Sequence, residues 1–187
     1  MRIPSFLRPR ALAAASALVL AALGGSALAQ AAYPSKPITI VVPYPAGGSN
    51  DTFARQVAKE LGDQLKQPVI IDNRPGASGN TGTGQVAKAA PDGYTLVAVS
   101  SSMTTNAAVQ SKLPFDPVKG LAPVAMFAKG PFIVAVNNEF PAKTPAELIA
   151  AIKAKPGQYN YASSGSGSVN QFGTELLKAK VGDLQIA

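Results

Sequence analysis

The sequence predicts an α/β fold in which short strands alternate with helices. From Tyr33 onward, continuous apolar runs alternate with segments whose apolar residues recur every three or four positions. In two places, residues 38–65 and 159–181, an apolar run passes through a glycine- and serine-rich loop into a helix. Ligands of open α/β sheets bind outside the carboxyl ends of the strands, so these loops are the first candidates for a site.

The first 29 residues predict a secretory signal peptide. Three arginines precede the apolar run Ala11–Leu23, which is shorter than the roughly 20 residues of a membrane span. Ala27-Leu28-Ala29 is a small-x-small cleavage site. Three of the 17 basic residues and none of the 10 acidic ones lie in this segment, so its removal lowers the net charge from +7 to +4. We therefore expect an exported, mildly basic protein.

The composition excludes several kinds of chemistry. The sequence contains neither cysteine nor histidine, so it offers no zinc site with these ligands, no Ser-His-Asp triad and no Cys-His dyad. The basic residues are dispersed and form no stripe with aromatic residues between them, which argues against nucleic-acid binding. We expect no metal, no cofactor and no catalytic residue.

The clearest helix of the first half begins at Thr52. Phe53, Val57, Leu61 and Leu65 recur every four residues and predict one apolar face. Asp51 in the first turn and Lys66 at the end suit the helix dipole. The other expected elements are strands at 38–42, 69–71 (buried) and 94–99, a glycine-rich turn at 76–84, and a short helix at 85–88.

In the second half, the segment Thr144-Pro145-Ala146-Glu147 predicts a helix start with a capping box. A later helix is marked by Phe172, Leu176 and Leu177 and is closed by Gly182. The remaining expectations are an irregular stretch at 103–121 interrupted by prolines, a crossing segment at 124–129, strands at 132–136 and 159–162, and the start of a strand at 184–187. Since a strand cut at its fourth residue leaves a sheet edge open, we expect a fragment of a longer protein.

Three polar loops form the predicted site. In the first, Pro43–Asp51, the backbone N–H groups of 46–50 and the Ser49 hydroxyl form a candidate anion cradle at a helix start. The second is 163–168, and the third is the hydroxyl run 100–102. The alternative interpretation makes the first loop an ordinary tight turn, with Asp51 as partner of the helix dipole, and the second a solvated turn capped by Ser168.

Other motifs have plainer explanations. The sequence Gly82–Ala87 fits Gly-x-Gly-x-x-Ala, but it does not directly follow a strand, and no acidic residue lies about 20 residues later. Asp72 and Glu175 have no spacing that pairs them with another carboxylate for acid-base chemistry. Arg74 is a candidate carboxylate clamp, although anchoring its own turn is the favoured interpretation.

Several of these motifs, in order along the chain, resemble the Bug-type receptors, the extracytoplasmic solute-binding proteins of tripartite tricarboxylate transporters. The segments that carry the resemblance are Tyr33–Ile38, Val41–Gly48, Asn73–Ala77, Ala89–Leu96, Leu113–Pro117 and Tyr159–Gly165.

The resemblance implies a type II periplasmic binding protein with two Rossmann-like lobes that closes over a small organic acid. Lobe 1 would span 33–126 and lobe 2, truncated in this chain, 127–187. The family holds the ligand carboxylate with backbone N–H groups, hydroxyls and bridging waters. Many members carry a histidine where this chain has Gln171, which bears on ligand choice. The partners implied are the organic acid and the membrane components of the transporter, and we expect a monomer in the periplasm.

The candidate ligand-binding residues are Tyr44, Ala46, Gly47, Gly48, Ser49, Asn50, Asp51, Ser100, Ser101, Ser163, Ser164, Gly165, Ser166, Gly167, Ser168 and Gln171. Two alternative functions stay open at this point. One is an exported α/β enzyme acting on an acyl or phosphoryl substrate, and the other is a ligand sensor for a membrane kinase.

Overall fold

The structure is a computed structural model that describes residues 32–182 and 184–187. The predicted signal peptide and its cleavage site lie outside the described residues. The elements in chain order are β1 (Ile38–Val42), α2 (Ser49–Leu65), β2 (Val69–Asn73), η1 (Ala77–Gly79), α3 (Asn80–Val86), β3 (Thr95–Val97), α4 (Ser102–Val109), α5 (Pro145–Ala154) and α6 (Val169–Val181). Among the described helices, none has the length and apolar character that a membrane span requires.

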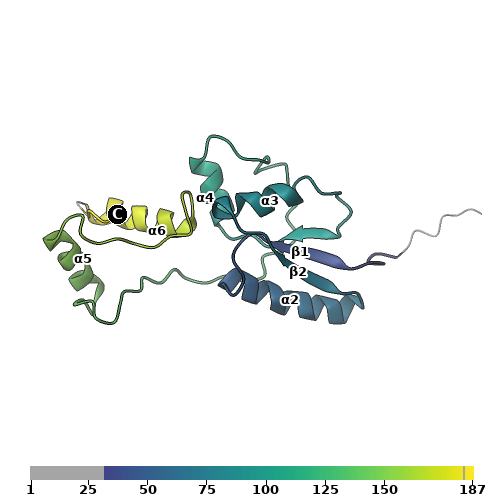
Figure 1. Cartoon of the computed structure of the whole chain (residues 1–187), viewed down its shortest axis with the longest axis horizontal. Helices are drawn as coiled ribbons and strands as arrows, with labels where there is room; N and C mark the ends of the chain where they lie inside the picture. Colours follow the sequence, from purple (N-terminus) through teal and green to yellow (C-terminus); the bar gives the residue numbers. More distant parts are fainter. Residues whose placement is uncertain (1–31, 183) are drawn as a thin grey trace, which may run out of the picture. The chain divides into compact units, whose positions relative to one another are not determined.

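The three strands form a parallel sheet in the order β2-β1-β3, which confirms the α/β prediction. Ile40 of β1 pairs with Ile71 on one side and Leu96 on the other. Helices α2 and α3 lie on opposite faces of this sheet (Figure 1). The central strand is therefore covered on both faces, as expected for an apolar parallel strand.

The core on the α2 face is built from Ile40 and Val42 of β1, Ala54 and Ala58 of α2, and Ala98 just after β3. The predicted apolar face of α2 is only partly correct, because Phe53 is 46% exposed. Alanine at two successive turns lets the helix lie close to the sheet, and that contact, rather than the largest apolar side chains, fixes the rotation of α2.

The strand β2 is less buried than predicted, since Ile70 is 51% exposed. This strand is at the edge of the sheet, and Ile70 is in register with Thr39, so its side chain lies on the α3 face. Because α3 contacts β1 and β3 rather than β2, that face of the edge strand stays uncovered.

The helix α3 begins at Asn80, so the prediction of a turn through Gly84 is wrong. A Cβ at Gly82 would lie 2.8 Å from the Arg74 carbonyl oxygen, and one at Gly84 would lie 2.9 Å from Cγ of Pro114. These glycines therefore serve close packing of a helix against its neighbours, and do not mark a turn.

A second helix was missed at α4, within the stretch predicted to be irregular. The helix ends before the proline-containing segment Leu113–Pro117, which is non-helical as predicted. The prolines break only the part of the chain that contains them, so the residues N-terminal to them were free to form a helix.

The predicted strand at 132–136 is wrong. Phe132, Ile133 and Val134 are 62%, 83% and 68% exposed, and the segment forms no ladder with any part of the chain that the structure describes. A strand forms where its backbone hydrogen-bonds to a neighbouring strand, and apolar side chains alone do not provide that neighbour. The crossing segment expected at 124–129 likewise has no regular structure.

The helix α5 begins as predicted. The Thr144 hydroxyl accepts the N–H of Glu147 at 3.2 Å, and the Glu147 carboxylate accepts the N–H of Lys143 at 2.6 Å. The capping box is thus present with one difference. The Glu147 carboxylate accepts the N–H of Lys143, whereas in the usual capping box it accepts the N–H of the N-cap residue, here Thr144.

Residues 159–162 and 184–187 were predicted as strands. Neither forms a regular strand, but the two segments run side by side with backbone hydrogen bonds in the pattern of a parallel pair. Tyr161 N–H donates to the Ala187 carbonyl at 2.8 Å, and Ala187 N–H donates to the Tyr159 carbonyl at 3.1 Å. The Phe140 ring packs against the Tyr159 ring, with 5.2 Å between the ring centroids.

Residues Lys36–Ala187 form one compact unit. The division into lobes at 126 and 127 therefore stays a prediction.

Candidate functional site

The loop after β1 and the loop after β3 meet through Tyr44 and Ser100. Their hydroxyl oxygens lie 2.7 Å apart, and the Ser100 N–H also donates to the Tyr44 hydroxyl at 3.1 Å. The Tyr44 ring packs against Gly79, where an added Cβ would lie 3.1 Å from the ring. These contacts join two of the three predicted loops at the carboxyl ends of the strands.

The Asp51 carboxylate is buried in the first loop and binds the loop itself. It accepts hydrogen bonds from Arg55 Nε at 3.0 Å, Gly47 N–H at 2.9 Å and Asn73 Nδ2 at 2.9 Å. The Arg55 bond, followed by those from Gly47 and Asn73, lowers the pKa of Asp51 to about 2. Asp51 is therefore an internal anion that fixes the loop. This geometry fits Asp51 as the partner of its own helix start better than it fits Asp51 as a ligand contact.

The prediction that every N–H of 46–50 is available needs one correction, because Gly47 already donates to Asp51. The start of α2 remains open beyond that residue. Gly48 caps the helix with no side-chain hydrogen bond, and within the described residues no hydrogen bond uses the N–H of Ser49 or Asn50. Ala46, Gly48 and Ser49 are exposed. This helix start thus presents unpaired donors at the positive end of the helix dipole.

The second loop, 163–168, satisfies most of its donors internally. Gly167 N–H donates to Gln171 Oε1 at 2.8 Å, Ser168 N–H to the Gly165 carbonyl at 3.1 Å, and Gly165 N–H to the Ser163 hydroxyl at 3.3 Å. The Ser168 hydroxyl accepts the Gln171 N–H at 3.3 Å and caps α6, as one of the two interpretations predicted. Gly167 and Ser168 are buried, whereas residues 163–166 are exposed, so this loop is a solvated turn whose last two residues are anchored.

The third loop joins the second. The Ser102 hydroxyl accepts the N–H of Val169 at 3.2 Å, and the Ser102 N–H donates to the Ser100 hydroxyl at 3.2 Å. Ser101 is exposed, and its carbonyl accepts the Thr104 hydroxyl at 2.7 Å. The three predicted loops are therefore connected into one polar surface through Tyr44, Ser100 and Ser102.

Sequence reasoning missed a buried polar cluster beside the second loop. Asn106 is fully buried, Asn80 is 4% exposed, and their side chains are 3.3 Å apart. Gln110 binds both amides, and Ser78 and Thr105 reach the loop itself. The run of glycine, serine, threonine and asparagine at 76–84 was the available signal, but it was interpreted only as a turn.

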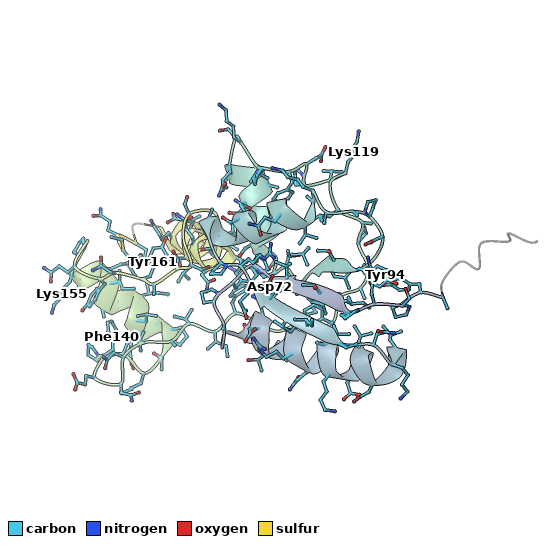
Figure 2. The ribbon with its side chains drawn as sticks, turned by 45° about the vertical axis from the view of Figure 1, so that its right-hand side comes forward. Asp72, Tyr94, Lys119, Phe140, Lys155 and Tyr161 are labelled. Carbon is cyan, nitrogen blue, oxygen red and sulfur yellow. The ribbon has the colours of Figure 1, made fainter. Side chains whose placement is uncertain are left out.

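The remaining candidates take the plainer roles. Arg74 Nε donates to Asp72 at 2.8 Å, and its Nη1 donates to Gln85 at 2.6 Å, which confirms that it anchors its own turn. Asp72, labelled in Figure 2, lies near the end of β2. Glu175 pairs with Lys178 at 3.0 Å. No group of three histidine, cysteine, aspartate or glutamate residues in the described ranges suits a metal ion.

A surface hollow of about 430 Å³ lies beside α3, with Asn80, Thr81, Lys88 and Lys112 among its lining residues. None of the predicted ligand-binding residues lines it. The candidate site is therefore not this hollow but the polar surface of the three loops. Its uncharged donors suit an anion, and its residues offer no acid-base pair.

Comparison with known proteins places these loops in context. Residues 53–186 match the family described as "Tripartite tricarboxylate transporter family receptor". BugT of Bordetella pertussis is 39% identical over 152 residues, which cover 80% of this chain and 47% of BugT. The chain spans about half the length of the curated relatives it matches.

Two similar solved structures are described with bound carboxylates. An R. palustris protein with adipate has 33% identity and a TM-score of 0.77, over 83% of this chain and 52% of that one. MatC from Rhodopseudomonas palustris, with bound malate, has 33% identity and a TM-score of 0.75, over 83% of this chain and 53% of that one. The fold is therefore that of periplasmic binding proteins of this family.

Proposed function

The chain belongs to the tripartite tricarboxylate transporter receptor family, and we propose that the whole protein captures a small organic carboxylate outside the cytoplasm and delivers it to the membrane components of such a transporter. Similar proteins described with adipate and with malate support the ligand class. The family is one of solute-binding receptors, which does not favour the alternative of an exported enzyme.

One observation carries the proposal for the site: the uncapped start of α2. The N–H groups of Ser49 and Asn50 are unpaired within the described residues, and the Tyr44–Ser100 hydroxyl pair lies at the base of the same loop. A carboxylate there would accept hydrogen bonds from amides that already point outward at the positive end of a helix. Arg55, the one cation that binds this loop in the described residues, is paired with Asp51. We therefore propose binding by neutral donors without a salt bridge.

We further propose that residues 33–126 and 127–187 belong to two lobes that close on the ligand, with the candidate residues of the second loop contributing from lobe 2. The free energy of closure would come from contacts made to the ligand only in the closed state. The mature protein would start after residue 29 and act as a periplasmic monomer.

Titration calorimetry and thermal shift of the full-length mature protein with adipate and malate test this proposal. A ligand at about 100 times its dissociation constant should stabilise the fold by about 2.7 kcal/mol. Absence of stabilisation by these two acids and by a broader panel of small carboxylates would contradict the proposed function.

The site is tested with Gly48→Leu. Gly48 has a φ of −73°, and a Cβ there would lie 3.5 Å from its nearest neighbour, the Pro45 carbonyl oxygen, so leucine fits the backbone but covers the adjacent N–H donors. We expect loss of carboxylate binding with the fold retained. Gly130→Leu is the matched control, because a Cβ at Gly130 meets no atom within 4 Å. Equal binding by both variants would place the ligand elsewhere.

A further inference from the structure

The turn between β2 and α3 holds two non-glycine residues in the left-handed region. Ala77 and Ser78 have φ of 47° and 55°, between Gly76 and Gly79, whose φ values are 139° and 96°. Residues with a Cβ adopt this conformation at a cost in free energy, and such strain concentrates at functional positions. Glycine would adopt it freely at 78, so the serine there contributes something other than backbone shape.

The strained turn is held from the α4 side. Asn106, which is fully buried, donates its Nδ2 to the Ser78 carbonyl at 3.0 Å. The Gly79 N–H also donates to the Gly76 carbonyl at 3.0 Å. With its backbone fixed in this way, Ser78 directs its hydroxyl at the second loop, where Oγ lies 2.9 Å from the Ser166 carbonyl oxygen and 3.3 Å from that of Ser164.

The second loop is shaped to receive this contact. A Cβ at Gly165 would lie 2.8 Å from Ser78 Oγ, and a Cβ at Gly167 would overlap Oδ1 of Asn106. Thr105 adds a second bond, from its hydroxyl to the Gly167 carbonyl at 2.6 Å. The loop is therefore held by its carbonyl groups at two neighbouring peptides.

We propose that Ser78 and Thr105 are positioning residues that lock the 163–168 loop, and with it the capped start of α6, in one conformation. In a trans peptide the C=O and the following N–H point in opposite directions. Holding the carbonyls of Ser166 and Gly167 against α4 and the strained turn therefore turns the N–H groups of Gly167 and Ser168 to the other side of the peptides, where they donate to Gln171 Oε1 at 2.8 Å and to the Gly165 carbonyl at 3.1 Å. The relevance of this lock to ligand capture rests on the proposed function.

The test compares Ser78→Gly with Ala77→Gly in the ligand-free full-length protein, by amide hydrogen exchange of residues 163–168. Both variants relieve the same backbone strain, and only the first removes the hydroxyl. We expect Ala77→Gly to leave exchange of the loop unchanged and Ser78→Gly to raise it about fivefold, the factor that corresponds to one lost hydrogen bond. Equal exchange in the two variants would overturn the proposal.

A second pair serves the other contact. Thr105→Val should raise exchange of the loop by a similar factor, whereas Thr104→Val should not, since the Thr104 hydroxyl binds the Ser101 carbonyl and not the loop. Unchanged exchange in Thr105→Val would remove Thr105 from the lock.

The effect on ligand capture separates this inference from the proposed function. Ser78→Gly should weaken adipate or malate binding by up to about fivefold, the limit reached when the locked conformation becomes the minor one in the free protein. If the parent protein binds no carboxylate, the proposed function fails, and the exchange experiment still decides whether the lock exists. If exchange rises but affinity stays the same, the loop is locked without serving ligand capture, and the inference is wrong on that point.

Discussion

The N–H of Gly167 donates to Oε1 of Gln171, four residues later, at 2.8 Å. The same relationship occurs in the first loop, where Gly47 N–H donates to Asp51 Oδ2 at 2.9 Å. Both glycines have positive φ, 77° and 83°, and in both loops the helix begins two residues after the glycine. The sequences Gly-Gly-Ser-Asn-Asp and Gly-Ser-Val-Asn-Gln are thus two versions of one helix start.

The two versions differ in charge. The first is closed by an ionised carboxylate that Arg55 balances, and the second by a neutral amide. The charge at 171 is therefore the simplest variable with which to test whether the second loop lies beside an anionic ligand.

Gln171→Glu should raise stability and lower affinity. A carboxylate at 171 can still accept the Gly167 N–H, and a negative charge in the first turn of α6 should stabilise the helix by about 0.3–1 kcal/mol. The same charge should repel a bound carboxylate. Urea unfolding and calorimetry with adipate or malate measure the two effects separately. Gln56→Glu, an exposed position on α2, adds the same charge as a control. Unchanged affinity in Gln171→Glu would show that the ligand is remote from this loop.

Asp51→Asn should alter the acid end of the stability profile. The pKa of Asp51 is lowered from 3.8 to about 2 in the folded state. Its contribution to stability is therefore present above pH 3.8 and is lost as the pH falls toward 2. We expect the parent protein to be more stable than Asp51→Asn at neutral pH, with the difference shrinking between pH 4 and 2.

Thermal unfolding across this pH range measures the difference. Asp63→Asn is the control, because the Asp63 carboxylate pairs with Lys59 on the exposed side of the same helix. A difference between the parent and Asp51→Asn that does not change with pH would contradict the assignment of Asp51 as the ionised anchor of the first loop.

Gly82→Ala and Gly173→Ala should have opposite effects, although both lie inside helices. Alanine is normally preferred over glycine in a helix by about 1 kcal/mol. At Gly173 a Cβ meets no atom within 4 Å, so the substitution should stabilise. At Gly82 it would lie 2.8 Å from the Arg74 carbonyl oxygen, and such overpacking costs about 1–3 kcal/mol. The denaturant midpoints of the two variants and the parent protein measure these changes in stability. Stabilisation by Gly82→Ala would contradict the close packing of α3 at Gly82.

Thr144→Ala should destabilise the protein by about 1 kcal/mol, because it removes the side-chain oxygen that accepts the Glu147 N–H at the start of α5. Ser111→Ala, at an exposed position outside the helices, should change stability by less than about 0.5 kcal/mol. The two free energies of unfolding in urea give the comparison. Equal values would mean that the cap does not stabilise α5 in the folded protein.

The sequence was sufficient where local chemistry decides the structure. Strand β1, helix α2 and the capped start at Thr144 follow from apolar periodicity and from one hydroxyl at the right position. The turn anchored by Arg74 was also predicted, because its partners lie close in the chain.

Prediction failed where the outcome depends on distant neighbours. Gly82 and Gly84 looked like turn residues, and only the positions of Arg74 and Pro114 show why a helix needs them. The apolar run at 132–136 looked like a strand, yet strand formation requires partners that the described residues do not provide. The polar run at 76–84 contains Ser78 but could not reveal its role, since that role depends on contacts with a loop 86 to 88 residues later.

A ligand-bound crystal structure of the full-length protein with adipate or malate decides whether neutral donors at the start of α2 hold the carboxylate. We expect the ligand carboxylate within hydrogen-bond distance of the N–H groups of Ser49 and Asn50, with no lysine or arginine nitrogen within 4 Å of it. A carboxylate held chiefly by a lysine or arginine, or bound away from this helix start, would contradict this expectation.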